Sequence, residues 1–113
     1  MATEDDLYAE GEKLKDEGKY EEAIEKFRQV LAVNEQHALA HFALAVMHGK
    51  VGQHAEAVQH GERACELDPD DPFSYTALSV TYQRAFAGTK DPQYIRLAEQ
   101  AMARSHAMQA PRW

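Results

Sequence analysis

The chain has 113 residues, of which 44% are hydrophobic and 27% are charged, and its formal net charge is −7. This length suits one domain, and the composition is that of a globular protein, which argues against a disordered, fibrous or membrane-spanning chain. An acidic chain also lacks the basic surface that nucleic-acid binding requires. We therefore expect a globular domain with no nucleic-acid partner and no membrane partner.

The N-terminus and the cysteine content favour a cytoplasmic location. Residues 1–6 are acidic and contain no apolar core of a secretory signal. A single cysteine, Cys65, makes an internal disulfide impossible, which fits a reducing compartment. Because Cys65 falls in an apolar helical stripe, we interpret it as a small buried hydrophobic residue and not as a catalytic nucleophile.

The first third of the chain predicts two helices joined by a tight turn. Thr3 and Asp6 form a candidate capping box, and helically spaced apolar or small residues follow it. Gly18 is expected to end the first helix in a left-handed conformation. A second helical stripe runs from Tyr20 to about Val33.

The middle of the chain repeats this arrangement. Helices are expected near residues 38–51 and 54–67, with Gly52 between them. The segment 68–72, Asp-Pro-Asp-Asp-Pro, closes this second pair because it combines turn residues with a helix start signal.

The last third predicts a fifth and a sixth helix. The fifth begins after Asp71, whose side chain can cap it, and is expected to end near Phe86 with Gly88 as its stop signal. A second pair of aspartate and proline at 91–92 predicts the start of a sixth helix, which runs to about Met108.

The sequence repeats itself at an interval of 34 residues. Gly18 corresponds to Gly52, and Ala23 corresponds to Ala57. Further equivalent positions of the three units are Leu7, His41 and Tyr75; Leu14, His48 and Tyr82; and Gly11, Ala45 and Ser79. A fixed period of this size is typical of a solenoid built from supersecondary units.

These residues resemble the tetratricopeptide repeat family. The second unit carries the pattern in His41, Leu44, Ala45, His48, Gly52, Ala57, Ala64 and Pro69. The first unit carries it in Leu7, Gly11, Leu14, Gly18, Tyr20, Ala23, Phe27 and Val30. The third begins with Tyr75, Leu78, Ser79 and Tyr82 and then departs, because its turn is longer.

The resemblance implies an all-α fold, a right-handed α-α superhelix of three antiparallel helical hairpins. The expected domain covers residues 1–108, with repeats at about 4–37, 38–71 and 72–108, and residues 109–113 form a C-terminal tail. In this family the first helix of each hairpin lines a concave inner face. The resemblance therefore implies a peptide-binding groove lined by Tyr8, Glu12, Leu39, Phe42, Val46, Lys50, Phe73, Thr76, Val80 and Arg84.

The function implied is a non-catalytic module that binds a protein partner through an apolar peptide or helix, with basic residues toward the acidic N-terminal end. An alternative use of the apolar residues, Phe42 and Val46 among them, is to seal the seams between hairpins. The family's carboxylate clamp for chaperone C-terminal tails is not expected. It needs lysine, arginine and asparagine at positions held here by Tyr8, Glu12, Ala43, Phe73 and Ala77.

A self-assembling scaffold is the alternative function. Residues 1–37 carry a net charge of −6 and residues 72–113 a net charge of +3, which suits head-to-tail contact between copies. Trp113 is a large apolar group at the end of the tail and could enter a neighbour's groove. In this hypothesis the chain forms a homo-oligomer.

No metal, cofactor or catalytic site is predicted. Six histidines are present, but His41, His48 and His54 take packing positions of the repeat and are expected to be packed or half-buried rings. If they are buried and neutral, charging them in acid should destabilise the fold. Gly61 stands where the first unit has Phe27. It either leaves room for a neighbouring side chain such as Phe73 or Tyr75, or reflects chance drift.

Overall fold

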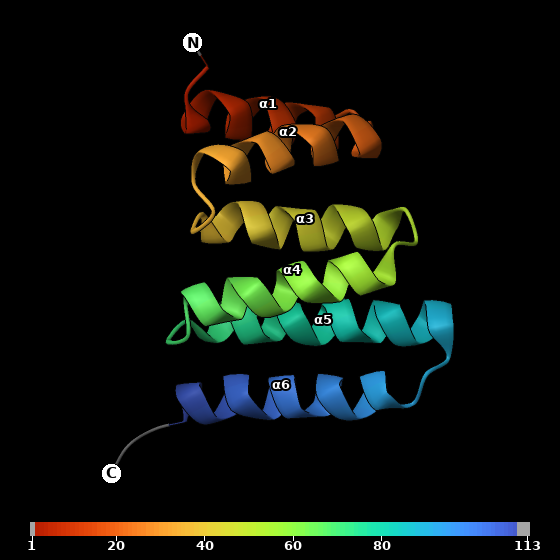
Figure 1. Ribbon diagram of the computed structural model, residues 1–113. Helices are drawn as coiled ribbons and strands as arrows, with labels where there is room; N and C mark the ends of the chain where they lie inside the picture. The colour runs from red at the N-terminus through yellow and green to blue at the C-terminus, as the bar shows by residue number, and fades with distance from the viewer. Residues whose placement is uncertain (1, 111–113) are drawn as a thin grey trace.

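The computed structural model describes residues 2–110, and these form six α-helices stacked as three antiparallel hairpins (Figure 1). The helices are α1 (Glu4–Asp16), α2 (Tyr20–Val33), α3 (Ala38–Lys50), α4 (His54–Leu67), α5 (Pro72–Thr89) and α6 (Gln93–Gln109). Each helix packs on the next in the chain, and α3 also contacts α5. No strand occurs among residues 2–110, so the predicted all-α solenoid is confirmed.

Side-chain caps fix the starts of two helices where the sequence predicts them. The backbone N–H of Asp6 donates to the Thr3 hydroxyl at 3.1 Å, and the Thr3 N–H donates to the Asp6 carboxylate at 3.3 Å. At α5 the N–H of Phe73 donates to Asp71 at 2.9 Å, and Pro72 takes the first position, where the helix needs no donor. Both predicted caps are confirmed.

Left-handed residues end three of the helices, although one of them differs from the prediction. Gly18 and Gly52 have φ angles of 77° and 81°, as expected. The prediction that Gly88 ends the fifth helix is wrong, because α5 continues past it and Lys90 takes the left-handed position with φ 64°. Gly88 is small for another reason: the ring of His54 on α4 lies where its Cβ would be.

Close packing within the first hairpin depends on a small residue that faces a large one. Phe27 of α2 is fully buried, and its ring lies over Gly11 of α1. A Cβ at Gly11 would come within 2.7 Å of the Phe27 ring, which is far inside van der Waals contact. The two helices can therefore approach this closely only with glycine at position 11.

Gly61 of α4 also makes room for a neighbour. It stands at the position of Phe27, and a Cβ there would lie 3.1 Å from the Leu78 side chain of α5. The interpretation that a bulky side chain fills the space is confirmed, but that side chain is Leu78 and not Phe73 or Tyr75. The exchange moves the large residue from α4 to α5.

Replacing Gly11 by alanine should destabilise the domain by roughly 1–3 kcal/mol, because the buried Phe27 ring has no room to move aside. Gly49→Ala is the matched control. Its Cβ would meet the Arg84 side chain at 3.8 Å, an ordinary contact, so the better helix propensity of alanine should raise stability by up to about 1 kcal/mol. Urea unfolding of both variants measures the difference. A midpoint for Gly11→Ala at or above that of the unmodified chain would contradict the packing described.

Three histidines of the second hairpin lie together between α3 and α4. The Nδ1 atoms of His41 and His60 are 3.0 Å apart, and the rings of His48 and His60 stack with centroids 5.6 Å apart. His41 and His48 are buried and His54 is half-buried, in agreement with the expectation of packed or half-buried rings. Desolvation lowers the pKa of His60 to about 4, aided by the charges that its two neighbours would carry.

His41 and His48 each have a hydrogen-bond partner outside the histidine group, although the buried Nε2 atom of His48 has none among the described residues. The Nε2 atom of His41 lies 2.8 Å from the backbone oxygen of Glu35, and Nδ1 of His48 lies 2.6 Å from the side-chain oxygen of Gln53. Across residues 2–110 no three His, Cys, Asp or Glu side chains are grouped to hold a metal ion. The same residues include no helix with the length and apolarity needed to cross a membrane.

Cys65 also has a structural role. Its side chain is buried, and its thiol donates to the backbone oxygen of Ser74 at 3.3 Å, which joins α4 to α5. Burial raises the pKa of the Cys65 thiol to about 11. A thiol that stays protonated near neutral pH is a poor nucleophile, so the prediction of a small buried hydrophobic residue holds.

The lowered pKa of His60 makes stability depend on pH. Above about pH 6.5 His60 is neutral in the folded and in the unfolded chain. Below that pH the unfolded chain binds a proton at His60, whereas the folded chain does not until the pH is much lower. The melting temperature should therefore fall by several degrees between about pH 7 and pH 5, where most carboxylates stay ionised. His60→Gln should flatten this slope, as thermal unfolding followed by circular dichroism can show. If the melting temperature of both proteins fell equally with pH, His60 would not be the cause of the pH dependence.

Candidate peptide-binding groove

An apolar slot lies between the inner faces of α3 and α5. Its lining comprises Phe42 and Val46 of α3 and Phe73, Thr76, Ala77, Val80, Thr81 and Arg84 of α5. The two helices are the first helices of consecutive hairpins and run in the same direction (Figure 1), so equivalent turns lie beside each other. Six of the ten predicted groove residues meet in this slot.

The apolar side chains of the slot keep exposed surface. Phe73 is 60% exposed and Val80 is 38% exposed. The rings of Phe42 and Phe73 lie 5.6 Å apart across the slot, tilted by 53°. Phe42 and Val46 are half-buried, and Val46 also packs on the core between the first two hairpins. Val46 therefore helps to seal the seam between the first two hairpins and lines the slot at once, which combines the two alternatives drawn from the sequence.

The threonines of the slot direct their polar atoms to partners inside the protein. The Thr76 hydroxyl lies 2.7 Å from the Ser105 hydroxyl of α6, and the Thr81 hydroxyl donates to the backbone oxygen of Ala77 at 3.2 Å. The polar groups of both threonines are therefore already used in hydrogen bonds within the protein. The other side chains that line the slot are apolar, apart from Arg84.

A second, smaller hollow continues the slot toward the N-terminal ends of α3 and α5. Leu39, Phe42 and Phe73 line it with apolar side chains, and Asp68 and Asp71 of the loop before α5 line it with carboxylates. Leu39 is 58% exposed, so it extends the exposed apolar surface of the slot. The predicted residue Leu39 thus lies beside the main slot and shares two of its side chains.

The predicted residue Tyr8 lies outside the slot and belongs to the packing of the first hairpin. Its ring is 5.5 Å from the ring of Phe27 and 5.2 Å from that of His37, on which it stacks. Burial raises the pKa of Tyr8 to about 12, and the neighbouring Glu12 carboxylate adds to the shift. Tyr8 therefore joins α1 to the start of α3.

The predicted residues Glu12 and Lys50 also lie outside the slot. The Lys15 ammonium donates to the Glu12 carboxylate at 2.7 Å, so this acid is paired on its own helix. Lys50 is exposed, and its ammonium lies 5.4 Å from the ring centroid of Tyr20. The slot therefore belongs to the second and third hairpins, and α1 contributes none of its lining.

The sequence reasoning did not assign Ala77 and Thr81 to the groove. Both lie on one helical row with Phe73, at steps of four residues, so helical spacing alone could have placed them there. The small side chain of Ala77 and the methyl group of Thr81 gave no chemical signal by themselves.

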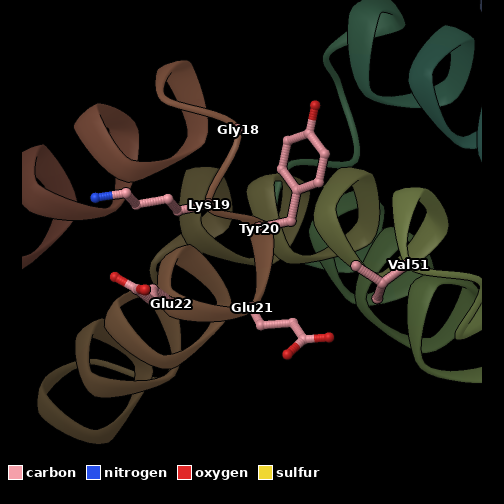
Figure 2. Close-up of a pocket in the computed structure, with 6 residues that line it drawn as sticks. All are labelled: Gly18, Lys19, Tyr20, Glu21, Glu22 and Val51. Carbon is pink, nitrogen blue, oxygen red and sulfur yellow. The ribbon is translucent and has the colours of Figure 1, made fainter.

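Another hollow lies where the turns of the first two hairpins meet (Figure 2). It is lined by Gly18, Lys19, Tyr20, Glu21, Glu22 and Val51. Figure 2 shows the side chains of Lys19, Tyr20 and Glu21 pointing in different directions and not toward a common centre. This hollow lacks the continuous apolar wall of the slot, and we assign no site to it.

Several solved structures share this fold. MamA superposes with a TM-score of 0.81 at 16% identity, over 96% of this chain and 59% of that chain. The second TPR of Spaghetti (RPAP3), bound to the HSP90 peptide SRMEEVD, gives 0.77 at 23% identity, over 94% and 92% of the two chains. PcrH, in complex with the chaperone binding region of PopD, gives 0.61 at 19% identity, over 93% and 90%.

Each of the sequence comparisons matches more than half of the chain. Anaphase-promoting complex subunit 3 of Schizosaccharomyces pombe is 31% identical over 65 residues, which are 58% of this chain and 10% of that protein. This chain therefore corresponds to about a tenth of its sequence relative. The family model described as tetratricopeptide repeat matches residues 8–72, more than half of the chain. Together with the six stacked helices, this match shows that the chain belongs to the tetratricopeptide repeat family.

Proposed function

We propose that the chain is a non-catalytic protein-interaction module whose slot between α3 and α5 binds an apolar segment of a partner protein. The observation that carries this proposal is the row of partly exposed Phe42, Val46, Phe73 and Val80 on a polar, acidic domain. Related folds support such a use, because the second TPR of RPAP3 and PcrH are both seen bound to segments of other proteins.

The length of the slot limits the segment that it can hold. Phe73 and Arg84 are eleven residues apart on α5, so the slot extends for about 16 Å along the helix. An extended segment of about five residues or a helix of about eleven would cover it. Apolar side chains on one face of that segment would meet the aromatic wall, as in other peptide grooves.

The compartment that we propose for this activity is the cytoplasm. The one cysteine of the chain, Cys65, is buried and contributes a hydrogen bond between helices, so the fold requires no oxidising environment. We place no chemistry in the slot, because the side chains that line it are apolar apart from the threonines and Arg84.

A charge placed in the aromatic wall should abolish binding. Short peptides selected from a random phage-displayed library against the chain should lose affinity by roughly 30-fold or more for Phe42→Glu, because a half-buried aromatic anchor is replaced by a carboxylate. Val33→Glu is the matched control, since Val33 is an exposed apolar residue on α2, outside the slot. Isothermal titration calorimetry gives both affinities.

Equal affinity of the two variants for every selected peptide would rule out the slot as the binding site. The same pair of proteins tests the alternative function, a self-assembling scaffold, which the net charges of −6 and +3 on the first and last thirds favour. In that case light scattering at low salt should show an oligomer that Phe42→Glu alone converts to a monomer. The predicted role of Trp113 in such contacts lies outside the described residues.

Chaperone tails should not bind. The positions at which the family's clamp carries its basic and amide side chains are held here by Tyr8, Glu12, Ala43, Phe73 and Ala77, of which Ala43 is buried in the core. The HSP90 peptide SRMEEVD, labelled for fluorescence anisotropy, should therefore show no saturation up to about 1 mM. The second TPR of RPAP3 serves as the positive control. Saturable binding to this chain that Phe73→Glu removes would contradict the exclusion.

A further inference from the structure

We propose that the slot has a fixed charge polarity and selects a segment with opposite charges at its two ends. Its ligand would carry a cationic side chain over Asp68 and Asp71, apolar side chains over Phe42, Phe73 and Val80, and a carboxylate over Arg84. This inference rests on the proposed function and specifies the chemistry of the partner.

The parallel course of α3 and α5 makes the two ends of the slot different. Because the first helices of both hairpins run in the same direction, their N-terminal ends lie together at one end and their C-terminal ends at the other (Figure 1). The loop between α4 and α5 brings Asp68 and Asp71 to the first end. Arg84 lies at the second end, along the same wall of α5.

Arg84 is the charged residue of the main slot, and its guanidinium is available. Its aliphatic stem passes over Gly49 of α3, where a Cβ would lie 3.8 Å from the Arg84 Cδ, and the side chain remains exposed. No carboxylate lies within ion-pair distance of it among residues 2–110. Arg84 lies five residues before the end of α5. It is therefore outside the last turn, where a positive charge would stabilise the helix through its dipole.

The end of the slot with Asp68 and Asp71 stays negative, because its carboxylates outweigh the partial positive charge of the α5 N-terminus. The N-terminus of α5 carries partial positive charge, and one Asp71 oxygen is used to cap it. Asp68 is exposed and forms no ion pair with any residue in the part of the chain that the structure describes. Asp70, which lies between the two, is exposed as well. The potential at this end is therefore set by surplus carboxylates.

This polarity runs along the helices and is separate from the charge gradient along the stack. The gradient, from −6 in the first third of the sequence to +3 in the last, distinguishes one hairpin from another. The slot polarity distinguishes the two ends of a single helix pair, from Asp71 to Arg84 about 20 Å apart along α5, on one continuous apolar wall. A ligand with charge at both ends can satisfy it only in one orientation, so the slot would impose a direction on the bound segment.

Sequencing of peptides from the same random phage-displayed library tests this inference. Peptides selected against the chain, and dependent on Phe42, should carry a cationic residue at one end of their apolar core and an acidic residue at the other. Selection against Arg84→Glu should replace the acidic residue by a cationic one and leave the apolar core unchanged. Selection against Arg96→Glu is the control, because Arg96 is an exposed arginine of α6 outside the slot.

A double-mutant cycle then measures the pairing at the basic end. Replacing the peptide's acidic residue by its amide should weaken binding to the chain by roughly two- to fivefold, and should have no effect on binding to Arg84→Gln. At the other end, Asp68→Asn should weaken the preference for the cationic residue, because Asp70 and Asp71 keep part of the negative charge. Added salt should reduce both effects, because the charges are exposed.

The possible outcomes separate this inference from the proposed function. Peptides that depend on Phe42 but show no charge preference, or whose preference is unchanged in Arg84→Glu, would overturn the polarity and leave the slot as a binding site. An absence of any peptide that depends on Phe42 would overturn both. Peptides with the same charge at both ends, bound equally well in high salt, would also contradict the polarity.

Discussion

The contact between a small residue on the first helix and a large residue on the second is the constraint on which the first hairpin depends. Phe27 can be fully buried only because Gly11 leaves its ring a place on α1. The packing faces of a first helix are used up by its own partner and by the hairpin before it. In the part of the chain that the structure describes, the remaining surface of α3 and α5 stays partly exposed, and there it forms the slot.

The second hairpin also pairs a small residue with a large one, but here the small residue is on its second helix, α4. Gly61 replaces the large residue, and Leu78 of the following helix enters the space, so the large side chain now comes from α5. The contact helps to fix α5 against α4 and thereby beside α3, with which it forms the slot. A glycine on the outer helix thus contributes to the geometry of an inner surface that it does not touch.

Helical periodicity and cap chemistry were sufficient to predict the six helices, because both depend on residues a few positions apart. The end of α5 was not predictable in this way, since Gly88 is a strong local stop signal and only the distant His54 shows why it is small. His60 was missed for the same reason, because its pKa is lowered by burial in the tertiary structure and by neighbours such as His41, nineteen residues away. The predicted groove residues Phe42 and Val46 of α3 and Phe73, Thr76, Val80 and Arg84 of α5 lie together in the slot. Tyr8 lies outside it, because its place depends on packing against Phe27 and against His37, the residue that caps α3.

The caps also explain why charge polarity arises in the slot of the last two hairpins. At the start of α5 the capping residue is an aspartate within an acidic loop, whereas at the start of α3 the ring nitrogen of His37 accepts the N–H of Ala40. A cap stabilises a helix start by about 1 kcal/mol whether it is charged or neutral, so folding alone does not select the aspartate. The choice matters for the electrostatic potential at the surface, because a carboxylate beside an apolar wall attracts a cation. The same residue can therefore determine where α5 begins and which end of a bound segment lies beside it.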